Sequence, residues 1–322
     1  MTEIPSVDVV VLSWNRSEST IATLLNILAQ EGVFPEIWVI DQGSEPQELE
    51  KLRTFTTSYS QIHLFENLKN IGVPAGRNQG MRLGHNDFIF CIDNDAIFET
   101  PCDLIKTIRR FEQDSSIAVI GFRIKLFLIG QLDLDSWVYP KPLLNQQDEE
   151  FYTTRFCGAG HAIRRSCLEE TSYYDESLFF YWEELDLSYK LINLGYKIIY
   201  FPEVTVLHKV SKENRISWNN DRFYFLVRNA LYLRWKYYRS GFQFFLMAMG
   251  YLLKSFRNKV SSQALRGIRD AQNMCNNPSK AKTQLLSKNS LAYIREYDTK
   301  PRGNIVKRLK YEILGELPGK NR

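Results

Sequence analysis

Two carboxylates separated by one residue, Asp93 and Asp95, follow a run of apolar side chains at residues 88–92. The run has the length and composition of a buried strand, so both side chains are expected where that strand ends. The carboxyl ends of strands in an open α/β sheet face the ligand crevice, and carboxylate oxygens there suit Mg²⁺ or Mn²⁺ with sites left for phosphates. An Asp-Asn-Asp turn also caps strands without any further role, so the rest of the chain decides between these interpretations.

A second group of carboxylates, Glu183, Glu184 and Asp186, lies about ninety residues further on and opens a predicted helix. Four aromatic residues at 179–182 precede it. A carboxylate beside aromatic rings is partly desolvated, which raises its pKa and suits it to act as a general base. Acidic residues in a first helical turn also complement the helix dipole, and this plain alternative stays open. Downstream, His208 follows a strand, as either a structural group or a third metal ligand.

Alternating strands and helices are predicted around these residues. Strands are expected at residues 7–12, 36–40, 62–66 and 88–92, with helices between them that begin near Ser17, Pro46 and Arg77. This βαβ order predicts a nucleotide-type half-sheet with helices packed against it. Further elements follow, but the pattern loosens over residues 125–154. That segment is either a lobe that recognises an acceptor substrate or a surface insertion without a binding role.

The net charge of +4 conceals a strong asymmetry along the 322 residues. Residues 1–221 contain 20 Lys and Arg against 32 Asp and Glu, whereas residues 222–322 contain 21 against 5. Residues 222–269 hold ten basic side chains and no acidic one, which favours an acidic or anionic partner surface. No Cys-x-x-Cys pair and no signal-like N-terminus are present. We therefore expect a cytoplasmic protein, peripheral at the inner face of the cell membrane if the basic region binds lipid.

Taken together, these segments resemble the family 2 glycosyltransferases, inverting enzymes of the GT-A fold, in their bacterial rhamnosyl- and galactosyl-type branch. The resemblance covers residues 6–210. It is carried by ordered motifs at residues 10–16, 39–44, 70–80, 93–95, 158–165, 182–187 and 202–208. It implies a mixed α/β sheet flanked by helices, with a catalytic domain at 1–215, a basic aromatic helical region at 216–275 and a basic, loosely structured tail at 276–322.

The resemblance also implies a nucleotide-sugar site and a divalent cation, Mn²⁺ or Mg²⁺. Asp41 would bind the base and Arg77 would lie near the diphosphate, while the metal ligands would be Asp93, Asp95 and His208. The whole nucleotide-sugar set comprises Ser13, Asn15, Arg16, Asp41, Gly72, Arg77, Asp93, Asn94, Gly158, Gly160 and His161.

In this family the general base is usually the aspartate of a Glu-Asp pair, and the matching position here is Glu184. Glutamate adds a methylene, so Glu183 and Asp186 remain alternatives. The implied reaction moves a sugar from a UDP- or dTDP-linked donor to a hydroxyl of a saccharide or lipid-linked glycan, with inversion, in cell-surface glycan synthesis. A degenerate member that only binds nucleotide or glycan is the alternative.

Two other enzyme classes fit less well. Aspartyl phosphatases need their Asp-x-Asp at the first strand, and sugar nucleotidyltransferases need a glycine-rich loop after it, which residues 12–16 lack. The uncharged stretch at 240–253 is shorter than the ~20 residues that span a bilayer. The basic region therefore lies on an anionic membrane, packs on the catalytic domain or forms a homo-oligomer; no nucleic-acid partner is expected.

Overall fold

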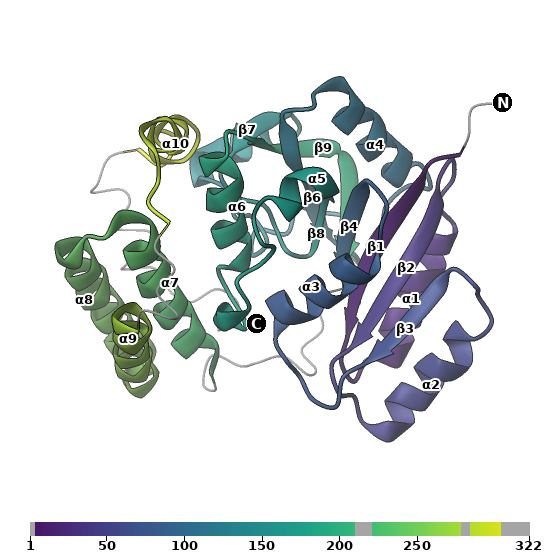
Figure 1. Cartoon of the computed structure of the whole chain (residues 1–322), viewed down its shortest axis with the longest axis horizontal. Coiled ribbons are helices and arrows are strands. Elements are labelled where there is room, and N and C mark those ends of the chain that lie inside the picture. Colours follow the sequence, from purple (N-terminus) through teal and green to yellow (C-terminus); the bar gives the residue numbers. More distant parts are fainter. Residues whose placement is uncertain (1–3, 210–220, 278–283, 304–322) are drawn as a thin grey trace.

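A nine-stranded mixed sheet forms the centre of the computed structural model, which describes residues 4–209, 221–277 and 284–303 (Figure 1). The strand order is β3-β2-β1-β4-β8-β6-β9-β5, and β7 pairs with β9. The strands are β1 Ser6–Ser13, β2 Phe34–Asp41, β3 Ile62–Glu66, β4 Phe88–Asp93, β5 Ala96–Phe98, β6 Ile117–Leu126, β7 Phe151–Thr153, β8 Gly160–Arg164 and β9 Lys197–His208.

The register of the parallel strands sets the position of the candidate site. β1 pairs in parallel with both β2 and β4, so Ser13 lies beside Asp41 and Leu12 lies beside Asp93. Valine and isoleucine fill these strands because both faces of the sheet are covered. The polar residues at the carboxyl ends of these three parallel strands therefore lie close together.

Helices cover the two faces of this sheet. They are α1 Ser17–Leu28, α2 Pro46–Thr56, α3 Val73–Leu83, α4 Asp103–Gln113, α5 Arg165–Glu169 and α6 Glu183–Asn193. One apolar core joins the sheet to α1 and α4, and a second joins it to α3, α5 and α6. The helix expected near Arg77 begins one turn earlier, at Val73, because Pro74 fits the first helical turn.

The strand that leads to His208 is longer than the sequence pattern indicates. β9 continues through Pro202, and its pairing with β6 shifts register between Phe122 and Arg123, opposite that proline. Such an irregularity lets a sheet accept a residue that cannot donate to the ladder. β9 therefore extends along the sheet as far as the end at which Asp93 and Asp95 lie.

The segment at 125–154 is better packed than its sequence pattern suggests. A short 3₁₀ helix, Lys141–Gln146, and β7 lie within it, and Trp137, Tyr139 and Phe151 pack around Tyr200 with ring centroids 4.8 to 5.5 Å apart. Aromatic pairs at these distances stabilise a core. The lobe is thus tied to β9.

The C-terminal helices α7 Phe223–Tyr238, α8 Gly241–Asn258 and α9 Ser261–Asn276 share an apolar core of their own. α7 also packs against the sheet domain, where the Trp182 indole donates to the Leu226 carbonyl at 3.0 Å. No helix within the described residues is long and apolar enough to cross a membrane.

Part of the segment expected to be loosely structured is helical. α10 Lys288–Ile294 and the π-helix Arg295–Thr299 bury Ile294, and the Tyr293 hydroxyl lies 3.2 and 3.3 Å from the Thr153 and Ile198 carbonyl oxygens. Residues 288–299 of the expected tail are thus helical, and some of their apolar side chains pack against the rest of the chain. Residues 278–283 and 304–322 of that segment lie outside the described residues.

A buried ion network joins α7 to α6. The Lys236 ammonium lies 2.6 Å from Asp186 and 2.8 Å from Asp175, and all three side chains are largely buried. We expect Lys236→Met to lower the free energy of unfolding by about 3–5 kcal/mol, because Asp175 loses its ion pair and the buried Asp186 keeps only Lys190. Urea denaturation measures this loss.

Lys300→Met is the matched control, because Lys300 pairs with Glu296 on the surface, where both side chains are more than half exposed. Its loss should stay below about 1 kcal/mol. Equal losses in the two variants would contradict a dominant role for the buried network.

Candidate active site

The loop after β2 is organised by Asp41. Its carboxylate accepts hydrogen bonds from the backbone of Gly43 and Ser44 at 3.0 and 2.9 Å, and from the Ser44 hydroxyl at 2.5 Å. Asn15, in the left-handed conformation at φ 51°, donates its backbone N–H to the same hydroxyl. Asp41 has no exposed surface. Asp41 therefore holds this loop in shape, and its contact with the nucleotide base stays a prediction.

The predicted metal ligands do come together. One oxygen each of Asp93 and Asp95 and one ring nitrogen of His208 lie within 4.8 Å of one another. Pairing of β5 with β9 explains this, because it sets Ala96 beside His208 immediately after the Asp-x-Asp turn. Arg16 donates to Asp95 at 2.8 Å, so this predicted residue also reaches the cluster.

His208 is held between two carboxylates. Its Nε2 lies 3.3 Å from Asp95 and its Nδ1 lies 3.4 Å from Asp133. Burial alone would lower the pKa of His208, but hydrogen bonds to Asp133 and Asp95 raise it to about 10. Asp133 was not predicted, since its only local signal is a turn in which it accepts from Asp135 and Ser136.

The donor set fits a divalent cation. Two carboxylates and one imidazole are oxygen and nitrogen ligands of the kind that Mn²⁺ accepts. Asp95 and His208 are nearly buried, while the Asp93 side chain is 42% exposed and leaves one side of the group open. Histidine binds a metal ion through an unprotonated ring nitrogen, so cation binding there would compete with protonation of His208.

Arg77 connects this group to the second set of carboxylates. Its guanidinium is buried and lies 2.9 Å from Glu184, 3.5 Å from Asp93 and 2.8 Å from the Gly158 carbonyl. A Cβ at Gly158 would lie 2.3 Å from the Glu184 carboxylate. Any larger residue at this position would therefore have to displace the Glu184 carboxylate from its place beside Arg77.

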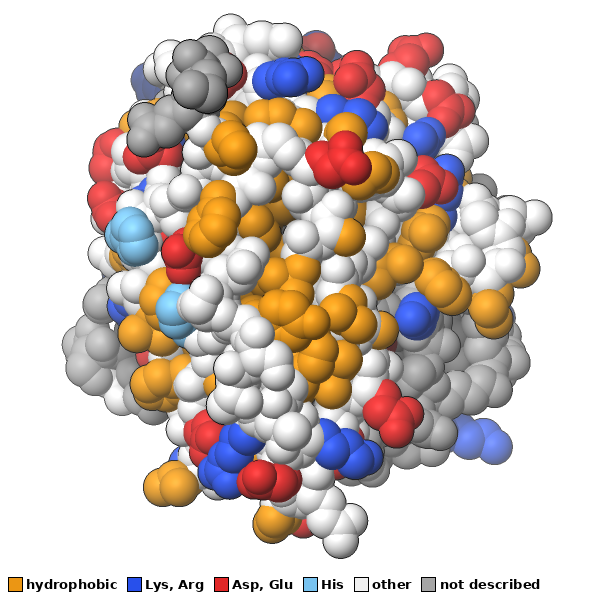
Figure 2. Space-filling view, turned by 90° about the vertical axis from the view of Figure 1, so that its right-hand side faces the viewer, with side chains coloured by type: hydrophobic (Ala, Val, Ile, Leu, Met, Phe, Trp, Pro, Cys, Tyr) orange, Lys and Arg blue, Asp and Glu red, His pale blue; other side chains and the backbone are white. Residues whose placement is uncertain are grey.

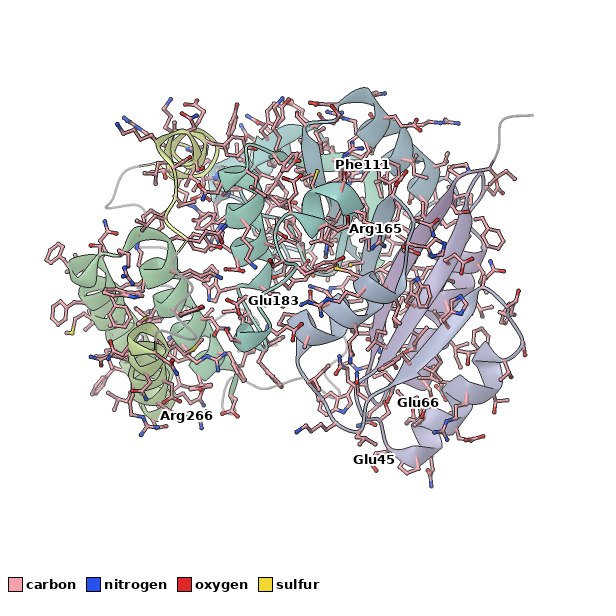
Figure 3. The ribbon with its side chains drawn as sticks, viewed as in Figure 1. Glu45, Glu66, Phe111, Arg165, Glu183 and Arg266 are labelled. Atoms are coloured by element: carbon pink, nitrogen blue, oxygen red, sulfur yellow. The ribbon has the colours of Figure 1, made fainter. Side chains whose placement is uncertain are left out.

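The neighbouring glutamates have different surroundings. Glu183, labelled at the start of α6 in Figure 3, is 3% exposed, and one of its oxygens has no hydrogen-bond partner among the described residues. Burial, and then the charge of Glu184, raises the pKa of Glu183 to about 8. The Glu184 side chain is 19% exposed and faces Arg77. Glu184 is thus the accessible carboxylate of the pair.

Asp186 does not fit the predicted alternative role as a base. It is fully buried and contacts Lys236 at 2.6 Å, the Tyr237 hydroxyl at 2.8 Å and Lys190 at 3.0 Å. A substrate proton has no path to this carboxylate. Its partner Lys236 on α7 lies fifty residues further along the chain. A contact at that separation depends on how the helices pack, so the sequence pattern did not predict it.

Several predicted ligand-lining residues are structural. His161 is fully buried in β8, with its ring nitrogens 3.1 Å from the Cys157 carbonyl and the Tyr174 hydroxyl. Burial lowers its pKa well below the ordinary value. Gly160 lies in the same strand, where a Cβ would approach Val206 to 2.8 Å. His161 and Gly160 therefore lie inside the sheet, and a contact with the donor sugar stays a prediction for both residues.

Three further predicted residues support the loops around the site. The Ser13 hydroxyl lies 3.1 Å from that of Thr20, which also accepts from the Asn94 amide at 3.0 Å. Gly72, at φ +90°, packs so closely that a Cβ would lie 2.6 Å from the Phe179 carbonyl. These contacts position β1, β4 and the loop before α3.

The segment before Glu183 is conformationally strained. Phe179, Tyr181 and Trp182 have φ of 62°, 71° and 72°, a region that side chains with a Cβ seldom adopt. The Asn229 amide nitrogen, from α7, lies 2.8 Å from the carbonyl oxygens of Leu178, Phe180 and Tyr181. α7 also carries Arg228, Arg234 and Lys236, so the sequence did not single out Asn229 for this support.

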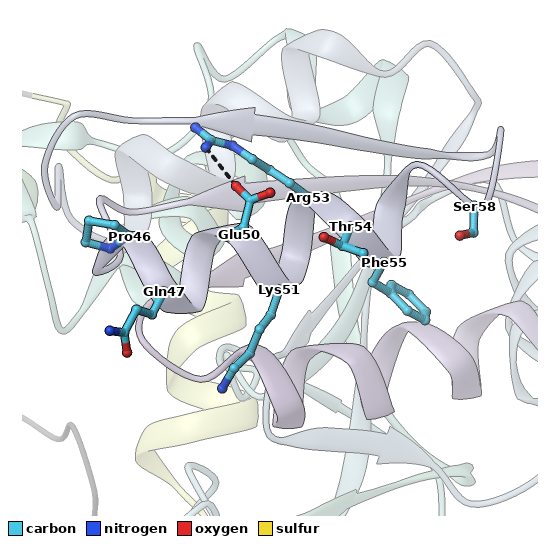
Figure 4. A pocket seen from close by; sticks show the side chains of 8 residues that line it. All are labelled: Pro46, Gln47, Glu50, Lys51, Arg53, Thr54, Phe55 and Ser58. Atoms are coloured by element: carbon cyan, nitrogen blue, oxygen red, sulfur yellow. Dashed lines mark hydrogen bonds and ion pairs between the residues drawn. The ribbon is translucent and has the colours of Figure 1, made fainter.

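An open hollow beside α2 is separate from these residues (Figure 4). Its charged groups are already paired, Arg53 with Glu50 at 3.3 Å and Lys51 with Glu48 at 2.8 Å. None of the predicted site residues lines it, so it is not the candidate site. Its lining is Pro46, Gln47, Glu50, Lys51, Arg53, Thr54, Phe55 and Ser58.

The raised pKa of Glu183 predicts a pH dependence of stability. The unfolded chain releases this proton near 4.5 and the folded chain near 8, so between these values raising the pH favours unfolding. Glu183→Gln removes this effect and should gain about 1.4 kcal/mol per pH unit relative to wild type over that window. Urea denaturation across pH tests it. Glu170→Gln, on the surface, is the control, and parallel curves for wild type and Glu183→Gln would refute the prediction.

Solved structures share the fold at low sequence identity. A mannosyltransferase from Pyrobaculum calidifontis, in complex with GDP-Man and Mn²⁺, superposes with a TM-score of 0.59 over 98% of this chain and 86% of that one, at 16% identity. GalNAc-T7 with UDP, GalNAc and Mn²⁺ gives a TM-score of 0.61 over 85% of this chain and 55% of that one, also at 16% identity. These similarities show the GT-A fold.

Sequence comparison gives the family. A poly-beta-1,6-N-acetyl-D-glucosamine synthase of Staphylococcus aureus (strain COL) is 24% identical over 206 residues, which are 62% of this chain and 49% of that protein. The chain thus spans about half the length of this curated relative. The model of the glycosyl transferase family 2 matches residues 8–172, about half of the chain. With the GT-A sheet and the carboxylate cluster at its edge, this match shows that the chain belongs to glycosyl transferase family 2.

Proposed function

We propose that this protein is an inverting, metal-dependent glycosyltransferase that acts in cell-surface polysaccharide synthesis. One observation carries the proposal: Arg77 joins Asp93 of the metal-type cluster to Glu184, the accessible carboxylate. A cation site and a candidate base are thus neighbours at the carboxyl edge of the sheet. Family membership and the name of the synthase relative support the reaction class.

A nucleotide-diphosphate sugar is the proposed donor. Two proteins of the same fold were solved with nucleotide or nucleotide sugar and Mn²⁺, which supports this class. A UDP- or dTDP-linked sugar, and a saccharide or lipid-linked glycan as acceptor, are the finer expectations. Residues 1–215 would carry the chemistry, and α7, within the proposed region 216–275, would support the loop before Glu183.

The proposed step is a single displacement. Glu184 accepts the proton of an acceptor hydroxyl, whose oxygen forms a bond to the anomeric carbon while the bond to the diphosphate oxygen breaks and its electron pair leaves with the diphosphate. Arg77 places Glu184 beside Asp93 and adds positive charge. Asp93, Asp95 and His208 would hold the cation, which when bound would stabilise the negative charge of the leaving group.

A binding protein without catalysis is the second candidate. One observation favours it, namely that Glu184 already forms an ion pair with Arg77 while Glu183 is buried with a raised pKa. Neither carboxylate is then a free base. Mn²⁺-dependent hydrolysis or transfer from a nucleotide sugar would separate the enzyme from the binding protein.

Metal-dependent nucleotide binding can be tested by thermal unfolding. A screen of nucleotide sugars should find one that raises Tm by about 5 °C or more, only in the presence of Mn²⁺. His208→Ala should lose this shift because it removes a ligand of the cluster. His63→Ala is the matched control, since His63 also pairs with a carboxylate, Glu36, but on another part of the sheet. Equal shifts in the two variants would exclude a role for His208.

The base and the stereochemistry are tested together once a donor is known. Glu184→Gln should lower kcat by about 10² to 10⁴, because the amide cannot accept the proton. Glu170→Gln, an exposed glutamate, should keep wild-type turnover. NMR of the product should show inversion at the anomeric carbon. Near-normal turnover of Glu184→Gln, or a retained configuration, would overturn the mechanism.

A further inference from the structure

The outer face of α8 is a continuous apolar stripe. Its members recur at spacings of three and four residues along the 18-residue helix, whose length is about 27 Å. Exposed fractions range from 42% for Met249 to 79% for Phe256. The inner face of the same helix packs on α7 and α9 through Ala248 and its neighbours. The stripe consists of Phe242, Phe245, Leu246, Met249, Leu253 and Phe256.

Exposed basic residues lie at both ends of this stripe. Arg239 precedes α8, while Arg257 and Lys259 lie at its carboxyl end, and all three are exposed. No acidic residue occurs anywhere from 222 to 269. The surface of α8 therefore combines exposed aromatic and aliphatic groups with positive charge alone.

The opposite side of the molecule differs in charge. α8 lies at the end of the molecule away from β3 (Figure 1), and Figure 2 views the side beyond β3. Hydrophobic side chains are exposed there too, but Asp, Glu, Lys and Arg side chains are mixed around them. Two exposed phenylalanines at that side of the sheet are Phe34 of β2 and Phe65 of β3. Exposed apolar groups alone therefore do not distinguish α8 from the opposite side of the molecule. The distinguishing feature is that the charged residues beside them are all basic.

We propose that α8 lies in the surface of an anionic lipid bilayer, with its stripe in the interface and its basic ends on the headgroups. Apolar side chains of this kind gain free energy by leaving water, and lysine and arginine are attracted to anionic lipid. α8 is not apolar enough to cross the bilayer, so it binds parallel to the surface. This inference does not rest on the transfer reaction, although it would bring the enzyme to acceptors held in a membrane.

A second copy of the chain fits this face less well. In a twofold dimer the same patch meets itself, so the basic ends of one α8 would approach those of the other, and residues 222–269 supply no acidic group to offset them. Like charges at an interface cost free energy. Anionic lipid supplies the complementary charge that a second copy lacks.

Vesicle flotation of the full chain tests the proposal. The protein should bind phosphatidylcholine vesicles that contain phosphatidylglycerol, bind pure phosphatidylcholine more weakly, and lose affinity at high salt because salt screens the attraction. Replacing Phe245 and Phe256 with serine should lower the partition coefficient by about tenfold per residue. Arg257→Gln with Lys259→Gln should remove the preference for the anionic lipid.

The matched control replaces Phe34 and Phe65 with serine, two exposed phenylalanines away from α8, and should bind as wild type does. Circular dichroism and Tm confirm that each variant is folded. Absence of binding to anionic vesicles, or equal loss in the α8 and control variants, would overturn the proposal. So would a dimer, measured by light scattering, that dissociates in the Phe245 and Phe256 variant while vesicle binding is unchanged.

Discussion

The burial of the Arg77 guanidinium is the constraint on which the rest of the site depends. A buried guanidinium is costly unless its donors meet acceptors, and here they meet Asp93, Glu184 and the Gly158 carbonyl. These partners come from the end of β4, the start of α6 and the loop before β8. Arg77 therefore requires the metal-type turn and the candidate base to lie together, and it sets the spacing between them.

A second dependence runs through α7. The strained segment before Glu183 is supported by Asn229, and the carboxylate of Asp186, one turn into α6, is neutralised by Lys236. Strained backbone persists only where surrounding contacts determine it. The C-terminal helices are thus part of the machinery that places Glu184. Because α7 meets the sheet domain on one side and α8 on the other, the apolar stripe of α8 is left facing outward.

The confirmed predictions concern where strands end, and they depend only on residues that are neighbours in the sequence. Strand ends at Ser13, Asp41 and Asp93 follow from apolar runs that stop at polar residues, and parallel pairing then gathers them. Side-chain direction and side-chain partners could not be predicted in this way. His161 and Gly160 lie inside β8, and Asp186 forms an ion pair with Lys236 of α7. Asp133 was missed because its contact with His208 joins residues 75 positions apart.

The sequence by itself determined the family and the order of strands and helices, because both are encoded by residue type and spacing beside apolar runs. The family resemblance named Asp93, Asp95 and His208, but the pairing of β5 with β9 is what brings them together. Only the tertiary structure decided which glutamate is accessible, since Glu183 and Glu184 differ by their surroundings and not by their chemistry. It also decided that one face of α8 stays exposed. The physical reason is the same in both cases: burial is a property of the packed chain, whereas residue type and spacing can be read before it folds.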